Sequence, residues 1–276
     1  MSFNLIKTLD DLNYLNNELL SRPYIGVDTE FRRTNKDNMR LALLQVNDGE
    51  EIYLIDAVLI SDPGDSCDFL FSDSVIKIFH SCKEDLEAIY SWTGNIMKNI
   101  FDTQLANAFL NGSYSIGYQD LVEQRLDVII EKKETRSNWI RRPLTDSQLS
   151  YAASDVEFLI HLYETQKDEL SKNSKLNWHD QDIERLLRFS PEKSFPFADL
   201  ERTLSKAEES RILNQFNKVV EDISLREGIN STLLFSKKAQ KDFLRLVLLK
   251  GLDSACQEIT LWRSKLLRED LLNLLK

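Results

Sequence analysis

The 276-residue sequence has only three cysteines and no long apolar segment. No stretch approaches the roughly 18 to 20 uninterrupted apolar residues that span a bilayer, so we expect no membrane-embedded part. Residues 1–5 lack the basic region and the small-residue cleavage site of a secretory signal. Cys67, Cys82 and Cys256 are widely separated and have no zinc-ligand spacing. We therefore expect free thiols in a reducing compartment, most simply the cytoplasm.

Positive charge is also scarce, and the formal net charge is −10 at pH 7. This value argues against a generic nucleic-acid-binding surface, which is normally basic. Residues 1–199 hold 21 Lys and Arg against 34 Asp and Glu (−13), whereas residues 200–276 hold 14 against 11 (+3). We expect different roles for the two regions. A site built from clustered carboxylates, neutralised locally by divalent metal, would add to the acidity of the first region.

Strand-like and helix-like segments alternate through the first region, and three short apolar runs predict a β-meander: residues 24–31, 41–46 and 52–56. Residues 47–50 form a good turn sequence. Residues 75–80 predict another strand, followed by a helix that opens at Ser81 with the Ser-x-x-Glu pattern of a capping box. The longest helix is expected to open near Thr145, with Gln148 as its capping partner. These elements predict an α/β fold in which helices flank a mixed sheet.

A domain boundary is predicted at residues 189–199, which contain two of the five prolines. No proline follows, and apolar residues recur at helical spacing: Ile212, Phe216, Val219, Val220 and Ile223. We therefore predict a first domain over residues 1–190, a linker over residues 191–200 and a small all-helical domain over residues 201–276.

Three groups of residues could carry chemistry. Asp28 and Glu30 end the first apolar strand, and their i, i+2 spacing directs both carboxylates to one face. Two acids there are costly without a cation, although so short a motif also occurs by chance. Asp85 lies in the first turn of a predicted helix. It is either a third metal ligand or an acid that the helix dipole favours at that place. Tyr151 and Asp155 share one helix face, beside a cleft or at a solvated boundary.

Five segments together resemble ribonuclease D, of the DEDD exonuclease superfamily, in order and spacing over roughly residues 20 to 170. They are Val27-Asp-Thr-Glu-Phe31, Leu41-Ala-Leu-Leu-Gln-Val46, His80-Ser-Cys-Lys-Glu-Asp-Leu86, Phe101-Asp-Thr-Gln-Leu-Ala106 and Arg136-Ser-Asn-Trp-Ile-Arg-Arg-Pro-Leu144. The resemblance implies a ribonuclease H-like fold and a 3′-5′ exoribonuclease that releases nucleoside 5′-monophosphates.

The resemblance also implies the site residues. Tyr151 would orient the attacking water, and two divalent ions would be bound by four carboxylates: Asp28, Glu30, Asp85 and Asp155. Oxygen ligands suit Mg²⁺ or Mn²⁺. Ser150 stands where the other branch of the superfamily has a histidine, so the tyrosine branch is indicated. A tyrosine with a pKa near 10 is a weak base, so we assign Tyr151 to water positioning and leave deprotonation to the metal.

Residues 261–267 and 270–275 are similar to the closing part of a helicase-and-RNase-D C-terminal (HRDC) domain. The chain has room for one such domain, where the usual bacterial pattern has two. Lys237, Lys238, Lys241 and Arg245 form a basic cluster there, which is either a solvated helix face or a phosphate contact. We assign five candidate substrate-binding residues: Thr29, Gln45, Lys237, Lys238 and Lys241.

Three functions are compared. The first is an exoribonuclease that trims tRNA precursors or other small structured RNAs with a free 3′ end, as a monomer that binds no membrane. The second is a nucleic-acid-binding scaffold on an inactive nuclease fold, which would lack a metal carboxylate, whereas none is missing. The third is a DNA-directed exonuclease, but no polymerase region follows. A helicase fragment is disfavoured because the sequence has no Gly-x-x-x-x-Gly-Lys-Ser/Thr loop for nucleotide phosphates.

Overall fold

The computed structural model describes residues 2–35, 38–130, 137–188 and 204–274. The chain divides into two compact units, one of Met1–Ala106 with Ser115–Glu169 and one of Asn107–Tyr114 with Leu170–Lys276. The boundary predicted from the prolines stays a prediction, and the linker predicted over residues 191–200 lies outside the described residues. Within the described ranges, no helix is both long and apolar enough to cross a membrane.

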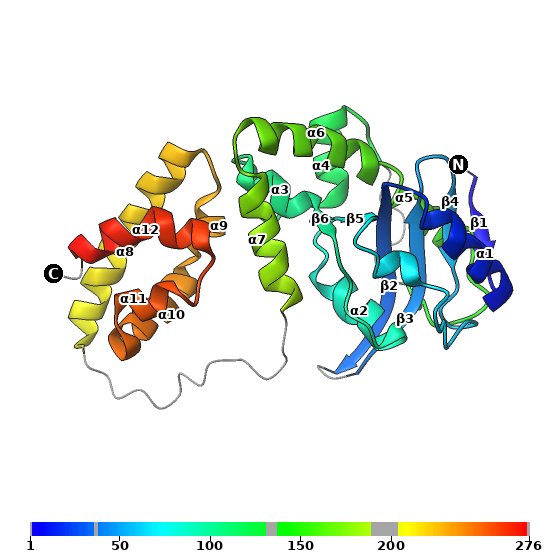
Figure 1. The fold of residues 1–276 in the computed structure, drawn as a ribbon, viewed down its shortest axis with the longest axis horizontal. Helices are drawn as coiled ribbons and strands as arrows, with labels where there is room; N and C mark the ends of the chain where they lie inside the picture. The colour runs from blue at the N-terminus through cyan, green and yellow to red at the C-terminus, as the bar shows by residue number, and fades with distance from the viewer. Residues whose placement is uncertain (1, 36–37, 131–136, 189–203, 275–276) are drawn as a thin grey trace. The chain divides into compact units, whose positions relative to one another are not determined.

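The first unit is built on a six-stranded mixed sheet with the order β1-β4-β3-β2-β5-β6 (Figure 1). Its strands are β1 (Asn4–Ile6), β2 (Tyr24–Asn35), β3 (Asn38–Asn47), β4 (Ile52–Ile55), β5 (Ile76–Phe79) and β6 (Ile100–Asp102). β2, β3 and β4 form an antiparallel meander, whereas β5 and β6 continue the sheet in parallel with β2. The predicted meander, the strand predicted at residues 75–80 and the α/β fold class are confirmed.

The helices of this part of the chain are α1 (Leu9–Leu19), α2 (Lys83–Thr93), α3 (Thr103–Phe109), α4 (Tyr118–Leu126), α5 (Asp146–Ser154) and α6 (Leu159–Lys172). Of these, α2 packs against β2 and β3, and α5 packs against β4. The odd-numbered side chains of β2 meet α2, because Thr29 and Arg33 bond to acids on that helix. The opposite face meets the start of α6, where a Cβ added to Gly26 would lie 3.1 Å from the Leu159 Cβ. A side chain larger than glycine here would crowd α6, so Gly26 allows the close approach of the α5–α6 junction to the start of β2.

The start of α2 differs from the prediction. The helix begins at Lys83 after an N-cap at Cys82, and no side chain caps it. Ser81 has a left-handed backbone (φ 66°), and its N–H donates to the Asp102 carboxylate. The predicted capping box is wrong because a carboxylate from the neighbouring strand already accepts the backbone N–H groups of this turn.

The predicted single long helix is two helices. The capping box of Thr145 and Gln148 is present, but α5 ends at Ser154 and α6 begins only at Leu159. At the break, the carbonyls of Val156 and Glu157 accept hydrogen bonds from the Asn47 side chain, 3.0 and 3.1 Å long. The sheet thus replaces intrahelical bonds, which the helical periodicity of the sequence does not reveal. The break makes Asp155 the C-cap of α5.

The second unit is helical, as predicted, with α7 (Leu176–Leu187), α8 (Lys206–Glu227), α9 (Ser231–Phe235), α10 (Lys237–Lys250), α11 (Leu252–Cys256) and α12 (Leu261–Leu274). Phe216, Phe235 and Phe243 form its aromatic core. Trp262 on α12 stacks on Trp178 of α7, with the ring centroids 5.1 Å apart. These contacts tie α7 to the C-terminal helices within one unit.

Candidate active site

The candidate site lies where β2 runs past its parallel neighbour. β5 pairs with β2 only over Tyr24–Gly26, so this edge of β2 is unpaired from Val27 onward. Asp28 and Glu30 stand on this free stretch, and α2 brings Asp85 beside it. The Thr29 hydroxyl donates to the Asp85 carboxylate, 2.5 Å away. An acid from a separate helix is thereby held against the strand that carries the first two.

The carboxylates are close enough to raise one another's pKa. Burial raises the pKa of Asp28 well above its usual range, and the charges of Asp85, Asp155 and Glu30 raise it further. Burial, together with Asp155 and Asp85, raises the pKa of Glu30 to about 8. Burial also raises the pKa of Asp85 and Asp155, while hydrogen bonds from Thr29 and Tyr151 oppose the rise. Acids from β2, α2 and the end of α5 therefore converge, as a bound cation would require.

Tyr151 and Asp155 come from the last turn of α5. Both are half-buried, next to the fully buried Ala152 and Val156, so they lie at the boundary between the core and the surface. Burial, followed by the charges of Asp155 and Glu30, raises the pKa of Tyr151 above its usual value. The phenol therefore remains protonated at neutral pH, available to donate a hydrogen bond but not to act as a base.

These side chains open into a cavity of about 270 Å³. Asp28, Tyr151 and Asp155 form one part of its lining, and residues near the start of α4 form another: Gly117, Tyr118, Gln119 and Asp120. The remaining lining residue is His80, whose ring nitrogens lie 2.9 Å from the Thr103 hydroxyl and 3.0 Å from the Ile116 carbonyl. The imidazole is thus fully engaged with the protein framework.

Asp102 has a structural role that the sequence analysis did not assign. Its two carboxylate oxygens accept the backbone N–H groups of four residues at 2.8–3.1 Å: Ser81, Cys82, Gln104 and Leu105. The first two form the turn from β5 into α2, and the other two open α3. Asp102 therefore fixes the direction in which α2 leaves the sheet, and with it the position of Asp85. The sequence shows an acid at the end of a short apolar run, within the segment Phe101-Asp-Thr-Gln-Leu-Ala106 that resembles ribonuclease D, but neither feature indicates this role.

Arg142 anchors the loop that carries Trp139, next to Tyr151. Its guanidinium forms a bidentate pair with the buried Asp56, at 2.6 and 2.7 Å, and donates to the Ala42 and Trp139 carbonyls. The Trp139 ring packs against Tyr151, with the ring centroids 6.1 Å apart. Arg142 thus holds a loop whose tryptophan limits the rotation of the Tyr151 ring. Arg142 lies in the segment of residues 136–144 that resembles ribonuclease D, but the sequence alone does not indicate this role.

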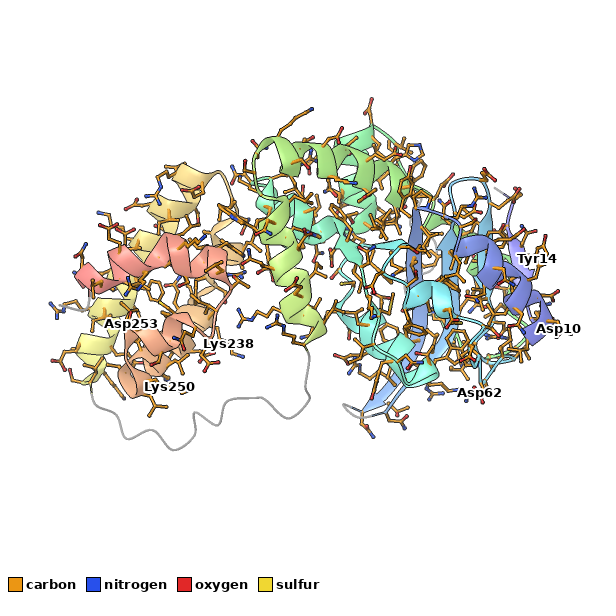
Figure 2. The ribbon with its side chains drawn as sticks, viewed as in Figure 1. Asp10, Tyr14, Asp62, Lys238, Lys250 and Asp253 are labelled. Atoms are coloured by element: carbon orange, nitrogen blue, oxygen red, sulfur yellow. The ribbon has the colours of Figure 1, made fainter. Side chains whose placement is uncertain are left out.

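The candidate substrate-binding residues differ in their surroundings. Thr29 is buried and bonded to Asp85. Gln45 lies opposite Asp28 on β3, has no exposed surface, and neither polar atom of its amide has a partner among the described residues. Lys237, Lys238 and Lys241 belong to the second unit. The first two are exposed in the first turn of α10, and Figure 2 labels Lys238 there. The Lys241 ammonium lies 3.8 Å from the Glu209 carboxylate.

The donor set suits a hard divalent cation, because it consists of carboxylates and a hydroxyl. Across the described ranges, no group of three or more His, Cys, Asp or Glu side chains has the arrangement of a metal site. Like-charged carboxylates separate when no cation holds them, and Asp85 is turned toward Thr29. The residues therefore fit a hard divalent cation by the chemistry of their oxygen donors and by the charge that they place side by side.

Comparisons with known proteins agree with this geometry. A family model described as 3'-5' exonuclease matches residues 3–171. Ribonuclease D of Pseudomonas paraeruginosa is 41% identical over 158 residues, which is 57% of this chain and 42% of that protein. Ribonuclease D of a Shewanella species is 37% identical over 184 residues, 67% of this chain and 47% of that protein. The chain thus spans about half the length of the curated relatives that it matches.

The crystal structure of Escherichia coli RNase D, an exoribonuclease involved in structured RNA processing, has a TM-score of 0.65 and 25% identity, covering 99% of this chain and 74% of that chain. The predicted ribonuclease H-like fold and the resemblance to ribonuclease D are confirmed by these matches. The assignments of individual site residues stay predictions.

Proposed function

Because the chain belongs to the 3′-5′ exonuclease family, we propose that it is an exoribonuclease. It hydrolyses RNA from the 3′ end and releases nucleoside 5′-monophosphates. The observation that carries the proposal is that carboxylates from β2, α2 and the end of α5 lie close enough to raise one another's pKa, beside a cavity that Asp28 and Asp155 line. A strand, a helix N-terminus and a helix C-cap bring these charges together at an energetic cost that a bound cation would offset.

We assign the binding of two divalent metal ions, Mg²⁺ or Mn²⁺, to Asp28, Glu30, Asp85 and Asp155. Such ions, when bound, activate a water, stabilise charge on the phosphate and assist the departing oxygen. Brucella melitensis NrnC, which shares the fold with a TM-score of 0.57 and 24% identity, has been solved with bound Mg²⁺. In this chain, the Thr29 hydroxyl restrains the Asp85 carboxylate, and pairing with β3 fixes the backbone that carries Asp28 and Glu30.

Tyr151 is assigned to positioning the attacking water. Its hydroxyl interacts with Asp155, and Trp139 packs on its ring. Since its pKa is raised, the hydroxyl holds its proton at neutral pH and can orient a water by donating to it. The proton of the water would pass to another acceptor, because a protonated phenol cannot take it.

The substrate proposed is RNA with a free 3′ end, such as a tRNA precursor or another small structured RNA. This rests on the ribonuclease D relatives and on the positive balance of residues 200–276. Phosphate contact by Lys237, Lys238 and Lys241, in an HRDC-like helical domain, belongs to the same proposal. We also propose a monomer in the cytoplasm, in keeping with three buried free thiols.

The test uses the purified full chain with 5′-labelled and 3′-labelled RNA, with and without Mn²⁺ or Mg²⁺. We expect a descending ladder from the 5′ label, early mononucleotide release from the 3′ label, and no reaction in EDTA. Asp28→Ala should abolish hydrolysis while circular dichroism and Tm show that the protein remains folded. Wild-type turnover in that variant would refute the assignment.

The same assay separates the alternatives. Faster cleavage of matched DNA than of RNA would favour a DNA-directed exonuclease. Tight RNA binding without cleavage, in either metal, would favour the scaffold on an inactive nuclease fold.

A further inference from the structure

The hairpin of β2 and β3 extends beyond the rest of the sheet (Figure 1). It carries a pair of opposed arginines. Arg32 on β2 lies directly opposite Arg40 on β3, and both side chains are exposed. Neither has a hydrogen bond or ion pair with any other described residue. Directly opposed side chains on paired strands have Cβ atoms roughly 4.5–5.5 Å apart, and like charges there are destabilising.

The pair faces the same way as the candidate active site. Alternate residues of a strand share a face, so Asp28, Glu30 and Arg32 lie on one side of β2. The register shift beside Glu30 places its extra residue, Ala42, on β3, so the alternation along β2 is unbroken up to Arg32. Arg32 is thus about 7 Å along the strand from Glu30.

The neighbouring arginine shows how the hairpin is held. Arg33 points to the opposite face, where its guanidinium lies 2.6 Å from Glu87 and 3.6 Å from Glu84 on α2. That ion pair fixes the hairpin against α2 and leaves Arg32 and Arg40 directed away from the acids of that helix. On β3, the carbonyl of the bulged Ala42 accepts a hydrogen bond from Arg142. The backbone of both strands is therefore fixed near Arg32 and Arg40.

We propose that Arg32 and Arg40 bind backbone phosphates of the substrate strand, upstream of the scissile bond. This inference rests on the proposed nuclease function and adds a subsite to it. A carboxylate cluster repels an approaching polyanion, and residues 1–199 carry a net charge of −13. The two guanidiniums, which no described acid neutralises, attract the RNA and so offset its repulsion by the carboxylates. A phosphate bound between Arg32 and Arg40 would also offset the repulsion between the two arginines. Phosphate contacts fix register and carry no base preference.

The test compares wild type, Arg32→Gln/Arg40→Gln and the charge-conserving Arg32→Lys/Arg40→Lys. Fluorescence anisotropy in EDTA measures binding of a labelled single-stranded RNA of about 12 nucleotides over a salt series. Loss of two phosphate contacts should reduce the slope of log Kobs against log salt by about 1.4, equivalent to roughly 25-fold weaker binding at 0.1 M salt. The lysine variant should keep most of the slope.

The matched control is Lys98→Glu, which changes the net charge by the same amount. Lys98 precedes β6, which runs parallel to β5 and β2, so it lies at the start of these strands, whereas the carboxylates of β2 lie beyond the end of its pairing with β5. An unchanged slope in the double glutamine variant, or an equal loss in Lys98→Glu, would overturn the proposal.

Kinetics separate this inference from the proposed function. With Mg²⁺ or Mn²⁺, the glutamine variant should show a raised KM on the long RNA, an unchanged kcat, and an unchanged kcat/KM on a dinucleotide that cannot reach the pair. Absence of hydrolysis in every protein, wild type included, would refute the nuclease proposal while the binding comparison still decides the role of the arginines.

Discussion

Asp102→Asn is the most informative single perturbation of the framework. The Asp102 carboxylate is buried, and its oxygens accept four backbone N–H groups: one oxygen accepts from Ser81, Gln104 and Leu105, and the other from Cys82. An asparagine has the same size but offers only one acceptor atom. Whichever way its amide is oriented, at least one backbone N–H then faces an NH₂ group.

The magnitude follows from these contacts. Hydrogen bonds to a charged acceptor contribute about 1.5–3 kcal/mol each, and a buried donor without a partner costs about 1–3 kcal/mol. With one bond lost and three weakened, we expect unfolding to be easier by about 2–4 kcal/mol. Because domains of this kind are stable by about 5–15 kcal/mol, the variant should still fold. The turn into α2 should nevertheless shift, and Asp85 with it.

Urea denaturation followed by circular dichroism measures the loss of stability, and single-turnover hydrolysis measures the effect on the site. We expect kcat to fall by about 10²-fold, the effect of displacing a catalytic group such as Asp85 by about 1 Å. Asp73→Asn is the control, because Asp73 is 79% exposed and its ion pair with Lys98 contributes little. A change in unfolding free energy below about 0.5 kcal/mol in Asp102→Asn would refute the reasoning.

Further predictions concern the site and its supports. Asp155→Asn should abolish metal-dependent hydrolysis without loss of fold, and any turnover near the wild-type rate would count against it. Tyr151→Phe should lower kcat by roughly 10²–10⁴-fold, the range for a positioned proton-handling group, with little change in RNA affinity; an equal kcat would remove it from the mechanism. Arg142→Gln should cost about 3–5 kcal/mol in urea denaturation, because the buried carboxylate of Asp56 loses its partner, and a loss under about 1 kcal/mol would contradict this. Burial raises the folded-state pKa of Glu30 to about 8, above its unfolded value, so without metal Tm should fall as the pH rises from about 4 to 8; a Tm that rises over this range would oppose the assignment.

Much of the first unit could be predicted from the sequence, because its signals are local. Alternating apolar runs with a turn sequence at residues 47–50 define the meander, and the i, i+2 spacing of Asp28 and Glu30 defines their common face. The capping box at Thr145 is also local, and it is present.

The predictions from the sequence were wrong where the hydrogen-bond partner of a helix end comes from a distant segment. The box expected at Ser81 is replaced by Asp102, which lies on another strand. The helix expected to continue past Asp155 is broken because Asn47, on β3, takes its carbonyls. In both cases a backbone hydrogen bond is satisfied from across the fold, and no window of neighbouring residues contains that information.

The two failures have one physical cause and the same consequence for the site. In each, a side chain of the sheet bonds backbone groups beside a helix end in place of the local partner that the sequence predicts. Each helix end carries a carboxylate: Asp85 at the start of α2 and Asp155 at the end of α5. A helix positioned only by its own hydrogen bonds can rotate or slide on the sheet. One whose terminal backbone groups are bonded to β3 or β6 cannot do so without breaking those bonds. The departures from local helix rules are therefore the devices that fix the acids against β2, and disrupting them should reduce catalysis more than it reduces the content of secondary structure.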